Sequence, residues 1–149
     1  MAAGTYTLYN SAKKKLNSAT INLATGVIRS KLFQGDSNAS DYTLSALASI
    51  TNPVTGGGYK AASGGSYALA NVTVTTVGSA KQYMFDADNT VYTASGADVT
   101  SIMYDVIYQS GGALIAWCKL SATAFTVTSG NTLTNQVNAN GYFTITSTP

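Results

Sequence analysis

Histidine and glutamate are both absent from this 149-residue chain, cysteine occurs once, and only 9% of the residues are charged, against about 25% in an average soluble domain. Without histidine, a serine or cysteine nucleophile lacks its usual general base. Without histidine, glutamate or a second cysteine, a transition-metal site is not expected either. The sequence therefore predicts a protein that is not an enzyme, with no catalytic, cofactor-binding or metal-binding residues.

The single cysteine, Cys118, excludes an intrachain disulfide. It lies in the most apolar stretch, Ala113–Cys118, so we expect a buried structural thiol rather than a nucleophile, which needs a nearby base or cation. No apolar run approaches the ~18 residues of a membrane span, and the first residues lack the charged-then-apolar order of a signal peptide. We expect a chain that is made in the cytoplasm and has no membrane partner.

The balance of charge is also weak, because eight basic and six acidic residues leave a net charge of +2. That value is too small to indicate nucleic acid as the main partner. A surface so poor in charge has two interpretations. Serine, threonine and asparagine cover it, or much of it lies in protein–protein contacts, whose centres are depleted of charge. We favour the second interpretation.

The residues that replace the charged ones favour an all-β fold. Threonine and the ten tyrosines favour strands, while glycine and asparagine favour turns. Thr100–Tyr108 alternates with the period of a strand, the turn Gln109–Gly112 follows, and Ala113–Cys118 comes next. This pattern predicts a hairpin at the centre of a sheet. One face of its first strand carries Ile102, Tyr104, Val106 and Tyr108, and the other, mixed face carries Ser101, Met103, Asp105 and Ile107.

Shorter elements fill the rest of the chain. Strands are predicted at Thr5–Tyr9, Ile21–Leu23, Val27–Phe33, Tyr67–Val77, Lys81–Phe85, Thr90–Thr93, Phe125–Thr128 and Tyr142–Thr146, the last after an Asn-Gly turn. In Tyr67–Val77 we expect Ala70, Val72, Val74 and Thr76 to face inward. A short helix is predicted over Tyr42–Ile50, capped by Ser40 or Asp41, and Ser11–Leu16 has helical propensity. We expect one β domain, residues 1–149, built as a β-sandwich or jelly roll of about eight short strands and one short helix, with residues 1–20 as a candidate N-terminal arm.

Three local patterns have a functional and a plain interpretation. Lys13–Lys15 is more typical of a solvated face than of a nucleic-acid contact. Gly56–Lys60 lacks the Gly-Lys-Ser/Thr order of a phosphate loop, so we interpret residues 54–66 as a flexible surface loop. Asp86–Asn89 begins like a calcium loop, but no glycine follows and the chain has no glutamate to close such a site. We predict a turn there.

Eight patches in order along the chain resemble a small structural protein that recurs in tailed bacteriophages. They are Asp41–Leu47, Gly56–Ala61, Ala70–Thr75, Met84–Asn89, Thr93–Val99, Val106–Ala116, Phe125–Thr134 and Asn138–Ile145. The first forty residues match less well, and each patch alone is a strand-and-turn pattern. The resemblance implies a virion component, assembled in the host cytoplasm, and it provides no catalytic or ligand residues.

Two functions fit this resemblance. The first is a capsid decoration, or cement, protein that binds and stabilises the head shell, with the major capsid protein as partner and a homotrimer as the expected oligomer, because capsids offer threefold sites. The second is a tail, adaptor or fibre component, including a host-surface binding module. In the second case Tyr59 and Tyr67 are candidate contacts to a glycan or receptor.

Overall fold

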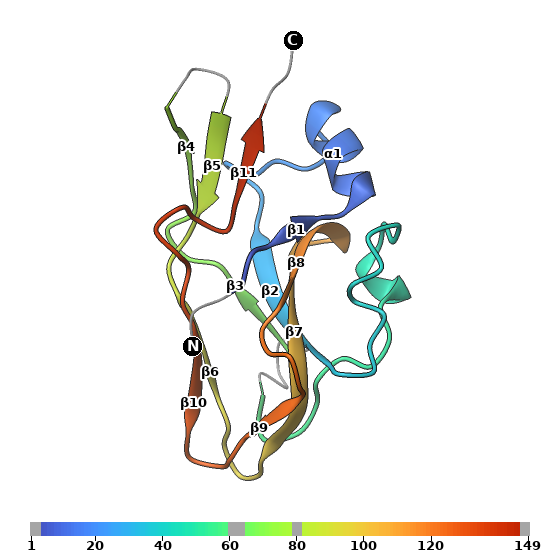
Figure 1. Cartoon of the computed structure of the whole chain (residues 1–149), viewed down its shortest axis with the longest axis vertical. Helices are drawn as coiled ribbons and strands as arrows, with labels where there is room; N and C mark the ends of the chain where they lie inside the picture. The colour runs from blue at the N-terminus through green and yellow to red at the C-terminus, as the bar shows by residue number, and fades with distance from the viewer. Residues whose placement is uncertain (1–3, 60–64, 79–81, 147–149) are drawn as a thin grey trace.

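A computed structural model describes residues 4–59, 65–78 and 82–146 of the chain (Figure 1). These residues contain eleven strands and one α-helix. The strands are β1 (Thr7–Leu8), β2 (Ile28–Gln34), β3 (Ser66–Ala68), β4 (Thr73–Thr76), β5 (Gln82–Asp86), β6 (Thr90–Thr93), β7 (Val99–Gln109), β8 (Ala113–Lys119), β9 (Phe125–Val127), β10 (Thr132–Asn135) and β11 (Phe143–Thr146). The helix is α1 (Asn10–Asn17), and a 3₁₀ turn, η1, spans Leu47–Ser49. The predicted all-β fold is confirmed, with more strands than the expected eight.

The largest sheet is built around the predicted hairpin. Its strand order is β1-β8-β7-β2-β3, and β9 also pairs with β7. Every pairing in it is antiparallel, and Val106 of β7 lies opposite Trp117 of β8. Gly111 and Gly112 close the turn with φ of 102° and 93°, which an L side chain rarely adopts. The hairpin at the centre of a sheet is therefore confirmed.

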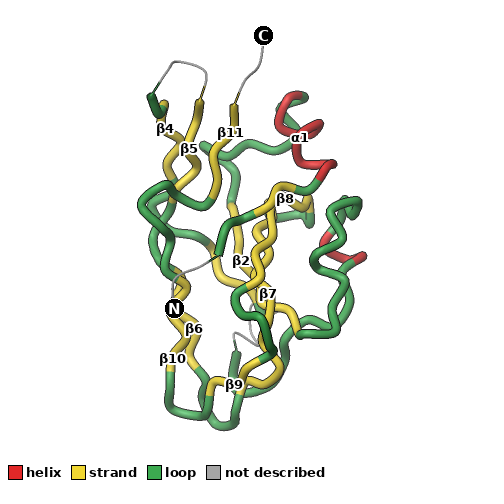
Figure 2. The backbone as a smooth tube through the Cα atoms, in the orientation of Figure 1, coloured by secondary structure: helices red, strands yellow, loops and turns green. Residues whose placement is uncertain are grey.

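Two smaller sheets cover one side of the large sheet. One has three strands in the order β11-β5-β4, and the other has two, β10-β6. Figure 2 shows these sheets on one side and the loop-rich segment between β2 and β3, which contains η1, on the other. Both covers are tied to the large sheet, since Tyr92 of β6 hydrogen-bonds Ser30 and the Tyr9 hydroxyl donates to the Ala39 carbonyl. The arrangement is sandwich-like.

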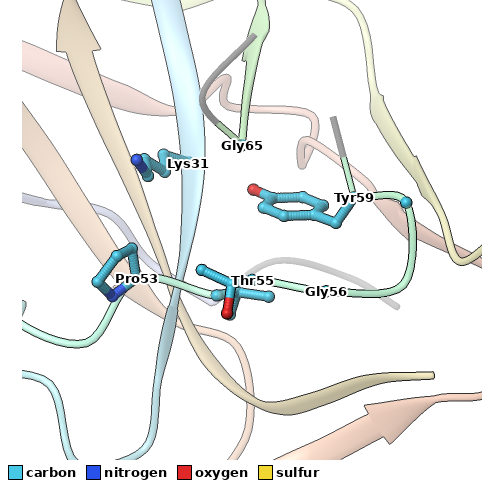
Figure 3. A pocket seen from close by; sticks show the side chains of 8 residues that line it. Lys31, Pro53, Thr55, Gly56, Tyr59 and Gly65 are labelled. Carbon is cyan, nitrogen blue, oxygen red and sulfur yellow. The ribbon is translucent and has the colours of Figure 1, made fainter. Parts of the chain in front are cut away.

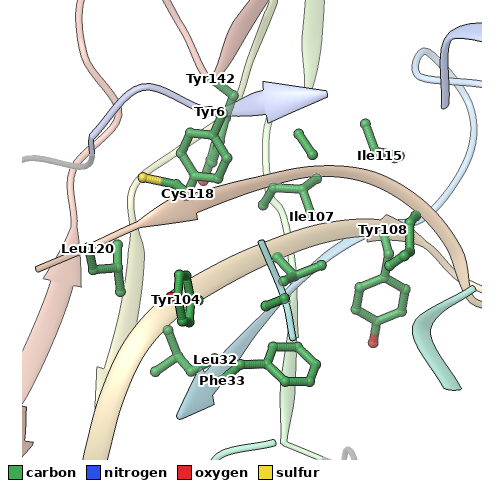
Figure 4. Close-up of a cluster of buried hydrophobic side chains, with 14 of the residues drawn as sticks. Tyr6, Leu32, Phe33, Tyr104, Ile107, Tyr108, Ile115, Cys118, Leu120 and Tyr142 are labelled. Atoms are coloured by element: carbon green, nitrogen blue, oxygen red, sulfur yellow. The ribbon is translucent and has the colours of Figure 1, made fainter. Parts of the chain in front are cut away.

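Covering the large sheet on both sides buries both faces of β7. The predicted apolar face is buried at all four positions, and Asp105 and Ile107 on the mixed face are fully buried as well. Figure 4 shows part of this core, where Ile107, Ile115 and Leu32 lie among tyrosine rings. A central strand between two layers buries side chains on both faces, so polar and apolar residues do not alternate strictly along β7.

The helix predicted over Tyr42–Ile50 is wrong, because only the 3₁₀ turn η1 forms there. Its backbone groups are used elsewhere. The Leu47 N–H donates to the Gly112 carbonyl across to the central hairpin, and the Asp41 carboxylate accepts the Thr43 N–H in a local turn. Such bonds compete with those of a helix. The one α-helix is instead α1, within the segment whose helical propensity the sequence indicated.

One predicted strand is also wrong, and another is interrupted. Ile21–Leu23 is a turn, because the Asn22 side chain accepts the N–H groups of Ala24 and Thr25. The stretch Tyr67–Val77 is broken into β3 and β4 around Asn71, whose φ of 50° is left-handed. The expectation that Ala70, Val72, Val74 and Thr76 face inward is wrong for three of them, which are exposed. Val72, just before β4, is half-buried against the core.

The strand β10 was not predicted, because Thr132–Asn135 alternates weakly and its burial comes from a distant partner, β6. The predicted surface loop 54–66 is wrong at several described positions, because Val54 and Tyr59 are buried in the core and Gly57, Gly65 and Ser66 are buried as well. Residues 60–64 of that loop lie outside the described part of the chain. Residues 4–20 pack against their own chain, where Tyr6, Tyr9 and Ala12 are buried.

Candidate functional site

A cluster of buried polar side chains surrounds Asp105 at the centre of β7. Its carboxylate accepts hydrogen bonds from the Tyr6 hydroxyl (2.6 Å), the Ser30 hydroxyl (2.5 Å) and the Asn135 amide (2.6 Å). Ser30 also hydrogen-bonds the Tyr92 hydroxyl. Because these residues come from β7, β2, β6, β10 and the segment before β1, the cluster joins the large sheet to the two-stranded sheet.

Burial raises the pKa of Asp105, and the hydrogen bonds from Ser30, Tyr6 and Asn135 only partly offset that effect. Asp105 and Ser30 have no exposed surface. A substrate therefore has no route to the carboxylate in this structure, and the arrangement acts as a structural connection. Sequence reasoning missed it, and the one available signal was a lone aspartate in an otherwise apolar strand.

The raised pKa of Asp105 predicts a pH-dependent stability. Between the ordinary aspartate pKa of about 4 and the raised native value, the unfolded chain releases the carboxyl proton while the folded chain retains it. The contribution of Asp105 to the free energy of unfolding therefore falls as the pH rises through this window, and it is constant above and below it. Urea unfolding of the wild type and of Asp105→Asn, followed from acid to neutral pH, measures this contribution as the difference between the two curves.

The free energies of unfolding of the wild type and of Asp105→Asn must be subtracted, because Asp41 changes the stability in the opposite direction with pH. Hydrogen bonds from the Thr43 side chain and N–H lower the pKa of Asp41, so its contribution to stability falls as the pH falls. Both proteins contain Asp41, and its effect cancels. A difference curve that is flat, or that rises with pH, would contradict the assignment to Asp105.

A surface groove separates β11 from β1 and α1. It consists of two adjoining cavities of about 480 and 330 Å³, which share Leu8, Lys13 and Thr144 in their linings. Leu16 and Ile145 add apolar surface at one end, and Lys13 is the only charged residue among the lining residues. The groove is thus long, largely uncharged and bounded by the edge strands of two sheets.

A separate cavity of about 330 Å³ lies beside the glycine-rich segment 54–66. Figure 3 shows Lys31 and Tyr59 on two sides of it. Burial lowers the pKa of Lys31. Residues 60–64, which follow Tyr59 in the sequence, lie outside the described part of the chain, and we assign no ligand to this cavity. Lys60, the lysine of the rejected phosphate pattern, falls in the same undescribed segment.

The two tyrosines considered for glycan binding are used inside the chain. Tyr59 is buried and its hydroxyl accepts the Leu32 N–H at 2.9 Å. Tyr67 packs edge-on against Tyr92, with ring centroids 4.7 Å apart. Tyr59 therefore has no surface to present to a glycan, and that part of the tail hypothesis is wrong for this residue.

The remaining residues that the sequence singled out, Lys13–Lys15, Cys118 and Asp86–Asn89, make contacts within the chain. Lys13–Lys15 lies on α1, where the Lys15 ammonium donates to the Ser45 carbonyl at 2.8 Å. Cys118 is buried, as predicted, and burial raises the pKa of its thiol to about 12, so a reactive thiolate does not form at neutral pH. Asp86–Asn89 links β5 to β6 in another sheet, and the Asp88 carboxylate accepts the Asn71 amide.

Within the described ranges, no three histidine, cysteine or acidic side chains gather as metal ligands, and no helix is long and apolar enough to cross a membrane. The fold and the site together define a small, sandwich-like all-β protein whose surface features are strand edges and a groove with one charged lining residue, Lys13. Comparisons with protein-family models, with curated proteins and with solved structures found no match.

Proposed function

We propose that this chain is a non-enzymatic structural protein of a tailed-phage virion, and that it binds the head shell as a decoration protein. The resemblance of the eight sequence patches provides the class. One structural observation carries the proposal further: the three-stranded sheet exposes apolar side chains, and its edge strand β4 contains no charged residue. Val74, Val77 and Tyr83 are 39%, 38% and 41% exposed on this sheet and its loop.

Such a surface is suited to contacts with other proteins. Exposed edge strands of soluble proteins are usually protected by charged residues or proline, and β4 has neither over Thr73–Thr76. Protein interfaces, in contrast, are depleted of charge and enriched in aromatic residues at their centres. A decoration protein adds contacts between capsid subunits, and a compact core with a charge-poor surface fits that task.

The tail, adaptor or fibre role remains the second candidate. It requires the same kind of protein–protein surface, and no described feature favours it over the head. Tyr59 is buried and is no longer a candidate for glycan binding in this hypothesis. The difference between head and tail lies in stoichiometry, because a shell has many equivalent sites and a tail has few.

The experiment that tests the proposal is the copy number of this chain per purified virion, measured by quantitative mass spectrometry against the major capsid protein. We expect hundreds of copies, in a simple ratio to the capsid protein. A dozen or fewer would exclude decoration and place the chain in the tail or portal. Its absence from particles of the phage that encodes it would exclude both roles.

A further inference from the structure

The three-stranded sheet has an unpaired edge at β4. The Val77 N–H donates to the Gln82 carbonyl of the adjacent strand at 3.0 Å. Because the direction of main-chain groups alternates along a strand, those of Thr75 also face β5, and those of Val74 and Thr76 point away from it. In the part of the chain that the structure describes, no other strand pairs with this edge.

The opposite edge, at β11, also pairs with no other strand among the described residues. On β5 the alternation directs the main-chain groups of Tyr83 towards β11, where Ile145 is its partner. Thr144 and Thr146, on either side of Ile145, therefore direct their main-chain groups away from β5. Both residues line the groove between β11 and α1. Figure 1 shows β4 and β11 on the two sides of β5, with α1 beyond β11.

Each copy of the chain thus carries an exposed strand and a groove with a strand edge along it. We propose that β4 of one copy enters the groove of a second copy and pairs with its β11. The two segments have the same length, four residues each. The exposed Val74 side chain then gains apolar neighbours, since Leu8, Leu16 and Ile145 line the groove. One contact of this kind removes one unpaired edge from each of the two copies.

The topology also determines the direction of the pairing. Both β4 and β11 run antiparallel to β5, so they run parallel to each other within one copy. In a ring whose axis runs along the strands this direction is kept, and the new pair is parallel. The contact joins two different surfaces, so it is head-to-tail, and we expect its repetition to close a ring of identical copies; an open filament would form if the rotation did not close.

Charge favours a second copy as the occupant. Lys13 is the only charged residue in the lining of the groove. The strand β4 is itself uncharged, but Asp86 lies opposite its first residue, Thr73, and Asp88 is bonded to Asn71 just before it. An entering β4 therefore brings two carboxylates to the side of a groove that carries one ammonium group. Such charges at the rim of a contact steer association more than they strengthen it.

The test is the mass of the full-length chain in solution, measured by native mass spectrometry and light scattering. We expect the wild type to form one discrete oligomer. In Val74→Lys a charge is placed on the entering strand and meets Lys13. In Thr144→Pro the outward N–H of β11 is removed without loss of a bond to β5. We expect each variant to be a folded monomer.

The matched control is Val91→Lys, because Val91 is 45% exposed on β6, away from both edges. It should leave the mass of the oligomer unchanged. The decisive sample is an equal mixture of the two monomeric variants. Val74→Lys retains an intact groove and Thr144→Pro retains an intact β4, so the mixture should form a dimer with one copy of each. A contact between two β11 edges would not produce this dimer.

A monomeric wild type, an oligomer that neither variant dissociates, or a mixture that stays monomeric would overturn the proposal. Circular dichroism of each variant verifies that a loss of mass is not a loss of fold. This inference does not depend on the virion role. If the chain is a monomer in solution but is present in hundreds of copies per particle, the ring is contradicted and the decoration role stands. If it forms the oligomer but is absent from particles, the decoration role is contradicted and the ring stands.

Discussion

Replacing Asp105 with alanine is expected to lower the free energy of unfolding by about 3–5 kcal/mol, because it removes the acceptor of several buried donors. The Tyr6 hydroxyl, the Ser30 hydroxyl and the Asn135 amide all donate to this carboxylate, and all three residues are buried. A loss of this size is a large share of the roughly 5–15 kcal/mol that stabilises a typical domain. Urea unfolding at neutral pH measures it.

Two controls separate the cluster from general effects of the substitution. Asp36 is exposed, so Asp36→Ala should change the free energy of unfolding by no more than about 0.5 kcal/mol. Ser30→Ala removes one donor and leaves the carboxylate with Tyr6 and Asn135, so its loss should be smaller than that of Asp105→Ala. If Asp105→Ala cost less than the serine variant, the carboxylate would not be the centre of the cluster.

This cluster shows what could not be predicted from the sequence. Its members stand at positions 6, 30, 92, 105 and 135, and hydrogen bonds between such distant positions depend on how the sheets stack. The sequence around Asp105 indicates only a strand whose second face mixes the polar Ser101 and Asp105 with Met103 and Ile107. Whether that face meets solvent or another layer is decided by β6 and β10, and β10 has almost no local signal.

The features that were predicted are those with local causes. The central hairpin follows from an alternating run, two glycines that accept positive φ, and an apolar run. The turn before β11 follows from Asn140 and Gly141, whose φ is 71°. In contrast, the helix expected at Tyr42–Ile50 fails because Leu47 donates its N–H to Gly112, a contact made by the folded chain and not by the local sequence.

The same distinction applies to the surface groove and the strand edges. Alternation in Tyr67–Val77 predicts a strand with one buried face, and the valines support it. The structure instead places β4 at the outer edge of a small sheet, where no other layer of the same chain covers it. An apolar pattern without a partner inside the chain is what a contact between chains produces, so the failed burial prediction is itself an argument for the head-to-tail pairing.

The second large effect is expected for Phe85→Ala in β5, which should lower the free energy of unfolding by about 3–5 kcal/mol. Phe85 is fully buried and stacks on Phe143 of β11, with ring centroids 5.0 Å apart and an interplanar angle of 15°. The Tyr142 ring lies near it as well, with centroids 5.9 Å apart. Removing the Phe85 ring leaves a cavity in the core beside Phe143 and Tyr142.

Whether that cavity weakens the whole fold or only releases the small sheet can be measured directly. Trp117 is the only tryptophan and lies in β8, so its fluorescence reports on the large sheet, while far-ultraviolet circular dichroism reports on all strands. Tyr142 packs on Tyr6 at 4.9 Å, which ties the small sheet to the Asp105 cluster. We therefore expect the two probes to give one coincident transition in Phe85→Ala.

The control is Tyr42→Ala, at an exposed position, which should change the free energy of unfolding by no more than about 0.5 kcal/mol. Separate transitions would mean that the three-stranded sheet unfolds on its own, and the stability of the large sheet would then not depend on the contacts of Phe85.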